Sequence, residues 1–158
     1  MLRLVPASTP EHWAAARRLV EEYAASLGVD LGFQDFRREL DALPREYGPP
    51  AGHFLLAADD AQTGLFVGCG AIRRFSPRTC EMKRLYLTSA ARGTDAGREL
   101  AQSLIDEARR LGYERIVLDT LPSMTEAPRL YASLGFTPIP QARANSWRQT
   151  GNSFPTCS

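Results

Sequence analysis

The segment from Leu87 to Leu111 constrains the fold more than any other part of the chain. An apolar run ends at Leu87, a turn containing Gly93 and Gly97 follows, and apolar residues then recur at helical spacing up to Leu111. The first N–H groups of such a helix have no partner within it, and the helix dipole adds positive potential there. The segment therefore predicts a strand, a tight turn and a long helix, with an anion site for a phosphate or pyrophosphate at the turn. A tight turn that binds no ligand is the alternative.

Apolar spacing predicts the other elements in the order β-α-α-β-β-β-α-β-α-β. Thr9 and Pro10 have the residue types of a helix start, and Pro44 is expected to end the second helix. This order predicts an α/β (α+β) fold with a mixed, mostly antiparallel sheet and helices packed on it. Strands are expected near 2–5, 54–58, 65–74, 80–87, 116–118 and 136–139, and helices near 10–27, 34–43, 96–111 and from 123 or 125 to 134.

Composition excludes several classes of protein. The chain has 158 residues, which suits one domain, and its formal net charge of +1 gives no electrostatic case for a nucleic-acid partner. No apolar run approaches the roughly 20 residues that span a bilayer, and no secretory leader pattern is present, so we expect a cytoplasmic protein. Cys69, Cys80 and Cys157 lack the number and spacing of a disulfide framework or a zinc site, so no metal is expected.

Three motifs in the second half of the chain resemble the GNAT superfamily of N-acetyltransferases. They are Glu-Met-Lys-Arg-Leu-Tyr-Leu from Glu81, Arg-Gly-x-x-x-Gly-x-x-Leu from Arg92, and Ala-x-x-Leu-Tyr-x-x-x-Gly-Phe ending at Phe136. The resemblance implies acetyl-CoA as co-substrate and a GNAT-like sheet that splays beside the cofactor. It implies cofactor contacts from the backbone of Leu85 and Leu87 and from the turn residues Arg92, Gly93, Thr94, Asp95, Ala96 and Gly97.

Two positions depart from the pattern of that family. Asp95 stands where glycine is usual, and Met124 stands where the family often has an asparagine that helps to position the cofactor. A carboxylate beside a pyrophosphate is unfavourable unless Asp95 points to solvent, to Arg92 or to Arg98. Asp95 could also cap the helix. We therefore expect cofactor binding that is weaker than is usual in the family.

Acetyl transfer to an amine needs a base for the amine and an acid for the departing thiolate. The resemblance assigns the acid to Tyr131, for which the alternative is a half-buried aromatic residue. It assigns the base to Glu81, for which the alternative is an ion pair with Lys83 or Arg73. His53 is expected to be structural.

Other polar residues have roles that the sequence leaves open. Asp119 is expected either to orient substrate or to cap a loop, and Lys83 with Arg84 form either a site for an acidic substrate or a solvated pair of charges. In the resembling family the acceptor lies near the first two helices, here about 23–47. That region contains Phe33, Phe36, Tyr47, Arg37, Arg38 and Arg45.

The sequence therefore predicts an acetyl-CoA-dependent N-acetyltransferase that acts on a small amine or amino compound by direct transfer. A non-catalytic acyl-CoA-binding or regulatory module on the same fold is the alternative, and a structural interaction domain is a third possibility.

The C-terminal end of the chain is expected to differ from the rest. We divide the chain into a GNAT-like domain at 1–142 and a tail at 143–158, where Trp147 and Phe154 are the only large apolar residues. Their spacing lacks the period of two that a half-buried strand needs. We expect an irregular tail and an uncovered sheet edge that a second copy of the chain could cover in a homodimer.

Overall fold

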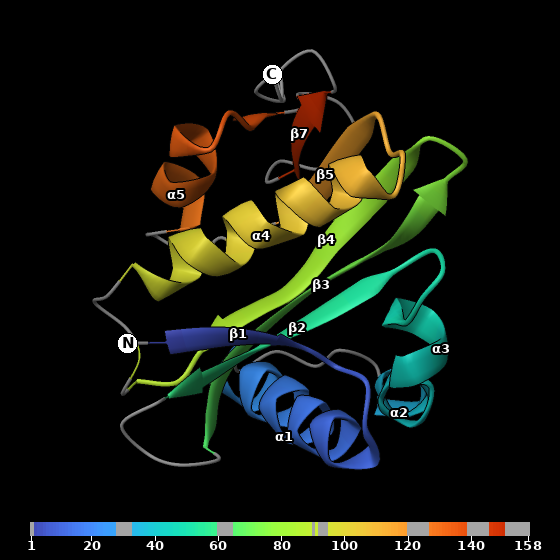
Figure 1. The fold of residues 1–158 in the computed structure, drawn as a ribbon, viewed down its shortest axis with the longest axis vertical. Helices are drawn as coiled ribbons and strands as arrows, with labels where there is room; N and C mark the ends of the chain where they lie inside the picture. The colour runs from blue at the N-terminus through green and yellow to red at the C-terminus, as the bar shows by residue number, and fades with distance from the viewer. Residues whose placement is uncertain are drawn as a thin grey trace.

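The computed structural model describes residues 2–27, 33–59, 65–89, 91, 95–119, 127–138 and 146–150. Its centre is a seven-stranded sheet in the order β1-β2-β3-β4-β5-β7-β6 (Figure 1). The strands are β1 (Leu2–Pro6), β2 (His53–Asp59), β3 (Phe66–Ser76), β4 (Thr79–Leu87), β5 (Arg115–Asp119), β6 (Thr137–Pro138) and β7 (Ser146–Thr150). The helices are α1 (Pro10–Leu27), α2 (Phe33–Asp41), α3 (Leu43–Tyr47), α4 (Ala96–Arg110) and α5 (Ala127–Ser133). The expected α/β fold with a mixed, mostly antiparallel sheet is confirmed.

The two faces of the sheet carry separate apolar cores. Along β2, Leu55 and Ala57 pack with α4, whereas Phe54 and Leu56 pack with α1, because successive side chains of a strand point to opposite faces. Figure 1 shows α4 and α5 over one part of the sheet and α1, α2 and α3 beside the other. The sheet therefore separates the packing of α4 and α5 from that of α1, α2 and α3.

The start of α1 follows the sequence signal. Its first residue is Pro10, and the Oγ1 atom of Thr9 accepts a hydrogen bond from the His12 N–H at 3.1 Å. This bond satisfies one of the N–H groups that a helix leaves unpaired at its start.

A bulge interrupts the pairing of β3 and β4. Cys69 pairs with Tyr86 and Ala71 with Lys83, so three steps along β4 match two along β3. Arg84 lies in the bulge with φ of 60°, a left-handed conformation that is uncommon outside glycine. Across from it, a Cβ on Gly70 would come within 2.8 Å of a terminal methyl group of Leu104, so glycine at this position lets α4 pack closely on β3.

The second helix ends before Pro44, and Pro44 belongs to a further helix. α2 stops at Asp41, and α3 begins at Leu43 with the proline in its first turn. Proline is tolerated in a first turn because its missing N–H would be unpaired there in any case. The expectation that Pro44 ends the second helix is wrong.

The tail contains a strand, which corrects the expectation of an irregular segment over these residues. β7 pairs antiparallel with β5, from Arg115 opposite Thr150 to Asp119 opposite Ser146, and it pairs with β6 on its other edge. Backbone hydrogen bonds to two neighbours hold a strand without the alternating apolar side chains that the sequence argument required. The division at residue 142 is still a prediction, and residues 151–158, with Phe154, lie outside the described residues.

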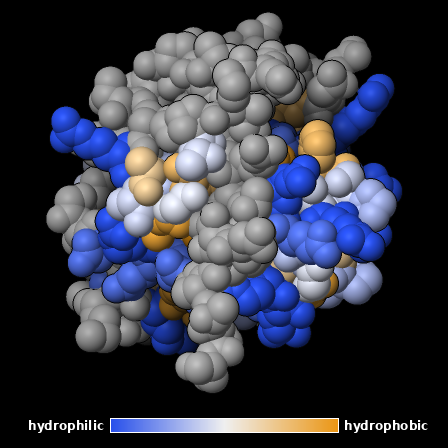
Figure 2. Space-filling model, turned by 90° about the horizontal axis from the view of Figure 1, so that it is seen from above, coloured by the Kyte–Doolittle hydropathy of each residue, from blue (hydrophilic) through white to orange (hydrophobic). Residues whose placement is uncertain are grey.

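The surface of the described residues is mainly polar. Figure 2 shows one face, where hydrophilic side chains surround small apolar areas. Among the described residues, Leu65 and Phe75 are the exposed large apolar side chains, and no described helix is long and apolar enough to cross a membrane. The described histidines, cysteines and carboxylates form no cluster that could hold a metal ion.

Candidate active site

The central feature is a splay between β4 and β5. The parallel pairing joins Thr79, Cys80 and Glu81 to Arg115, Ile116 and Val117, whereas β4 continues to Leu87 without pairing to β5. We call the stretch 82–87 of β4 the splay. A ligand that carries amide groups can lie along a strand where its pairing with the neighbouring strand ends, because such groups can bond to backbone N–H and C=O groups. Leu85 and Leu87 lie in the splay and pack their side chains on the α4 core, an arrangement that fits the amide-bearing pantetheine arm of acetyl-CoA.

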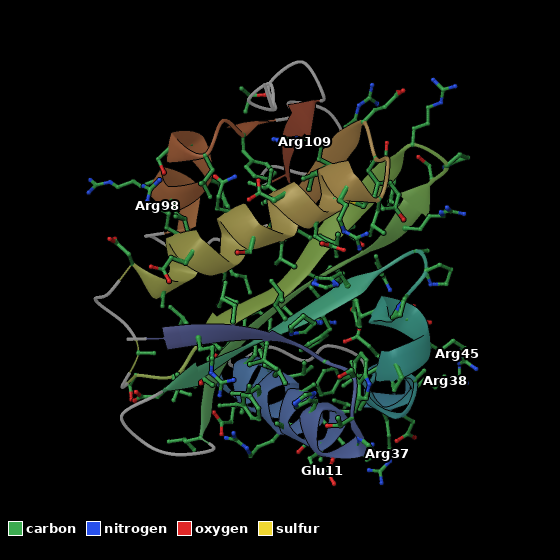
Figure 3. All side chains as sticks on the ribbon, viewed as in Figure 1. Glu11, Arg37, Arg38, Arg45, Arg98 and Arg109 are labelled. Atoms are coloured by element: carbon green, nitrogen blue, oxygen red, sulfur yellow. The ribbon has the colours of Figure 1, made fainter. Side chains whose placement is uncertain are left out.

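The N-terminus of α4 lies beside the end of the splay. Asp95 occupies the N-cap position, and its C=O accepts a hydrogen bond from the Glu99 N–H at 2.9 Å. Its exposed side chain makes no capping hydrogen bond, so the capping role is not seen in the described structure. Arg98 donates to the Ser133 Oγ atom at 2.8 Å, on α5 (Figure 3). Asp95 thus has the solvent exposure that makes a neighbouring anion tolerable.

The next two residues of the turn lie at the start of α4. Ala96 is buried, and a Cβ on Gly97 would lie 3.5 Å from Leu87 and 3.7 Å from Leu130, which are ordinary contacts. The described packing therefore leaves room for alanine at position 97. Arg92, Gly93, Thr94 and Met124, which the sequence assigned to the cofactor, lie outside the described residues.

Two tyrosines approach the splay from opposite faces of the sheet. Tyr131 lies buried on α5, with its ring against the edge of Phe136 at a centroid distance of 5.7 Å. Burial raises the pKa of Tyr131, and the phenol of Tyr23 on α1 raises it further. The ring of Tyr23 contacts Tyr86 of the splay at 5.7 Å. The Tyr131 hydroxyl therefore stays protonated at neutral pH.

Glu81 is the last residue of β4 that pairs with β5, and its carboxylate forms an ion pair. The Arg73 Nε atom donates to Glu81 Oε1 at 3.2 Å, and Arg73 Nη1 reaches Glu46 Oε2 on α3 at 3.3 Å. The ion pair with Arg73 that was the alternative for Glu81 is therefore present. A role as base is not excluded by it and is still a prediction.

A buried ion pair that the sequence did not reveal joins α2 to the bulge. Arg84 donates from Nε to Glu39 Oε2 at 2.9 Å and from Nη2 to Oε1 at 2.8 Å, and the two side chains are only 13% and 12% exposed. The Tyr47 hydroxyl adds a hydrogen bond to Glu39 at 3.0 Å. Burial alone would raise the pKa of Glu39, but the Arg84 guanidinium outweighs burial and the pKa is lowered. The guanidinium lies 6.0 Å from the centre of the Phe36 ring.

Lys83 lies between these ion pairs and belongs to neither. It is half-buried, and in the part of the chain that the structure describes its amine makes no salt bridge or hydrogen bond. Burial lowers the pKa of Lys83, and the charge of Arg84 lowers it further. It is also the only lysine of the chain, beside 18 arginines.

The similarity of this chain to known proteins identifies its family. The model of the acetyltransferase (GNAT) family matches residues 13–136. The chain belongs to the GNAT acetyltransferase family. An uncharacterized N-acetyltransferase of Schizosaccharomyces pombe is 45% identical over 121 residues, 76% of this chain and 73% of that protein. The IAA acetyltransferase of Azospirillum brasilense is 33% identical over 77% of this chain and 76% of its own length.

Solved structures agree on the fold. A GNAT acetyltransferase from Staphylococcus aureus has a TM-score of 0.80 at 16% identity, covering 96% of this chain and 99% of its own. A putative acetyltransferase from Salmonella typhimurium, solved with its cofactor acetyl-CoA, has a TM-score of 0.66 at 20% identity, covering 100% of this chain and 98% of its own. The chain is therefore an N-acetyltransferase, and acetyl-CoA is the acetyl donor of its family.

The other candidates from the sequence do not gather at the splay of this acetyltransferase. His53 Nδ1 lies 3.8 Å from the Glu107 carboxylate of α4, and burial lowers the pKa of that histidine. Asp119 pairs through its backbone with Ser146, and its side chain is outside the described set, as is that of Phe33. Figure 3 shows Arg37, Arg38 and Arg45 on the outer side of α2 and α3.

Proposed function

We propose that this acetyltransferase transfers the acetyl group of acetyl-CoA directly to a small amine. The observations that carry the proposal are the end of the β4–β5 pairing at Glu81 and the burial of Tyr131 in the same core as Leu85 and Leu87. Acetyl-CoA supplies an activated acetyl thioester. The residues proposed to hold it are Leu85, Leu87, Arg92, Gly93, Thr94, Asp95, Ala96, Gly97 and Met124. The rice glucosamine 6-phosphate N-acetyltransferase, 30% identical over 54% of this chain, is named for a small amine and supports this acceptor class.

Two side chains are proposed to move protons. Tyr131 keeps its proton because burial raises its pKa, so its hydroxyl can donate to the departing thiolate. Glu81 is proposed to take the proton that the acceptor amine must lose, and Arg73 holds its carboxylate in place. The acid and the base then belong to α5 and β4, on either side of the reacting atoms.

Direct transfer is favoured over a covalent cysteine route. Cys69 and Cys80 are buried, and burial raises the pKa of each thiol to about 12. A cysteine nucleophile needs its thiolate form near neutral pH, which these two described cysteines lack.

An amine panel with acetyl-CoA and a thiol reagent tests the proposal. We expect thiol release that depends on one class of small amine, with mass spectrometry showing one acetyl group added to the amine. Binding of acetyl-CoA without thiol release for any amine would instead support the non-catalytic module.

A further inference from the structure

Among the described residues, Lys83 is a charged group without a direct partner, and it lies two residues from the proposed base Glu81 on β4. It stands two residues after the last β4–β5 pair, and its register partner Ala71 continues the regular pairing of Glu81 with Arg73. Glu81 and Lys83 therefore share one face of β4, because side chains of a strand alternate. That face is the one toward α1, α2 and α3, since Ala71 opposite Lys83 packs in that core and Arg73 opposite Glu81 reaches Glu46 of α3.

The neighbouring carboxylates are already bound by arginines. Glu39 accepts two hydrogen bonds from Arg84 and one from Tyr47, and Glu81 accepts one from Arg73. An ammonium group that is partly removed from water and makes no salt bridge or hydrogen bond is unfavourable, even with Glu81 and Glu39 in the neighbourhood. Among the described residues no carboxylate is in direct contact with Lys83, and an anionic ligand can supply that contact.

Resting on the proposed function, we propose that the acceptor is a small amine that carries a carboxylate, and that Lys83 binds this carboxylate beside Glu81. Alternate residues of a strand are roughly 7 Å apart along the chain, and an amino acid holds its amine one carbon from its carboxylate. A carboxylate bound at Lys83 thus directs the amine toward Glu81, the proposed base. The rings of Phe36, Tyr23 and Tyr86 lie near this face and can cover the apolar part of such a compound.

Matched pairs of acceptors test the proposal kinetically. The pairs are L-tyrosine with tyramine, L-histidine with histamine, L-tryptophan with tryptamine, and glucosamine 6-phosphate with glucosamine. In the parent protein we expect at least one carboxylated member to exceed its partner in kcat/KM. In Lys83→Met that preference should fall about ten- to hundredfold, the range for a hydrogen bond to a charged group, and mainly through KM.

Two further variants separate charge at this position from other effects. Lys83→Arg keeps the cation and should retain most of the preference. Arg74→Met removes one positive charge from an exposed residue of β3 and should leave the preference unchanged. Loss of kcat in Lys83→Arg would overturn the proposal in favour of proton transfer by Lys83.

A titration gives a readout that does not depend on turnover. Because Lys83 is the only lysine, ¹³C reductive methylation labels a single side-chain amine in addition to the N-terminal amine. The charged groups that act on it are Arg84 and Glu81 on β4, Arg73 on β3 and Glu39 on α2. We expect the carboxylated substrate to raise the pKa of Lys83 by NMR, since an anion favours the ammonium form, and the decarboxylated amine not to raise it.

Each remaining outcome decides the question. The proposal would be overturned by equal kcat/KM for both members of every carboxylate pair, or by turnover of the non-carboxylated amines alone. It would also be overturned if Lys83→Met kept the preference of the parent protein. A preference confined to glucosamine 6-phosphate would replace the carboxylate with a phosphate and overturn it as stated. Absence of thiol release with every amine would contradict the proposed function. The titration would then still show whether Lys83 binds a carboxylate.

Discussion

Tyr131 and Asp95 are the two single residues whose roles can be tested most directly. Tyr131 combines burial with a position beside the splay, and Asp95 places an exposed carboxylate at the helix N-terminus where the pyrophosphate is proposed to bind. Their substitutions should affect different quantities, since one residue is proposed to act on the chemical step and the other on cofactor affinity.

Tyr131→Phe should lower kcat by about a hundredfold or more, the usual contribution of a general acid, because it removes only the proton donor. Acetyl-CoA affinity by calorimetry should change little. Tyr113→Phe is the matched control, since Tyr113 is also buried but donates its hydroxyl to the Ala51 C=O outside the site. A Tyr131→Phe protein with the parent kcat would exclude Tyr131 as the acid.

Asp95→Gly should tighten acetyl-CoA binding by up to about fivefold at low salt, because one unit charge a few ångströms from another in water is worth about 1 kcal/mol. Glycine is nearly as good as aspartate at an N-cap, so the helix should tolerate the change. The gain should shrink in high salt, which screens exposed charges. Equal or weaker affinity at low salt would show that the carboxylate lies away from the bound cofactor.

At the level of elements, α2 is attached at two points of very different burial. Glu39 pairs with Arg84 of β4 at 12–13% exposure, whereas Asp41 pairs with Arg17 of α1 at 2.7 Å with side chains 62% and 39% exposed. Breaking a buried pair leaves an uncompensated charge, whereas exposed pairs contribute little. The two carboxylates of one helix therefore form a matched comparison.

Glu39→Gln should reduce the free energy of unfolding by about 3 kcal/mol and Asp41→Asn by less than about 1 kcal/mol in urea titrations. The pKa of Glu39 is lowered in the folded protein, so its contribution is present above the unfolded pKa of about 4.3 and is lost as pH falls through the folded pKa. Acidification should therefore narrow the difference between parent and Glu39→Gln. Equal losses for the two variants at neutral pH would contradict a structural role for the buried pair.

The first turn of α4 offers a test in which stability and binding move in opposite directions. Gly97→Ala should raise the free energy of unfolding by about 0.5–1 kcal/mol, because the described atoms leave space for a methyl group and alanine favours the helix. The same methyl group should weaken acetyl-CoA binding if the backbone of the turn approaches the pyrophosphate. Unchanged affinity in calorimetry would place the pyrophosphate elsewhere.

For the whole molecule, acetyl-CoA should stabilise the fold by linkage. At a concentration of about 100 Kd the gain is about 2.7 kcal/mol, which corresponds to a rise in Tm of roughly 5–10 °C for a chain of this size. Adenosine, which lacks the pyrophosphate and the pantetheine arm, is the control and should leave Tm unchanged. A Tm that does not move with saturating acetyl-CoA would contradict the proposed cofactor site.

The fold bears on whether the protein forms a homodimer. The homodimer was inferred from an uncovered edge of the sheet, but β7 covers that edge of β5. The outermost strands are β1 and β6, and each ends in a proline, which blunts an edge against pairing. A homodimer is therefore still a prediction, and the uncovered sheet edge no longer supports it.

The sequence by itself determined the element order up to β6 except for α3, the long helix α4 and the family. Periodicity and capping residues such as Thr9 act between neighbours in the chain, so they can be read without coordinates. The motif around Tyr131 named a segment that packs in the same core as Leu85 and Leu87, and the role of Tyr131 as the acid is still a prediction.

Only the tertiary structure decided which charges are paired and where the sheet ends. Glu39 and Arg84 are 45 residues apart, and no local pattern distinguishes their buried ion pair from two solvated charges. β7 is a strand because β5 and β6 present backbone groups on both of its edges, a property of its neighbours rather than of its own side chains. The sequence shows that Lys83 is the only lysine, but its lack of a direct partner among the described residues depends on which carboxylates the arginines bind in the folded protein.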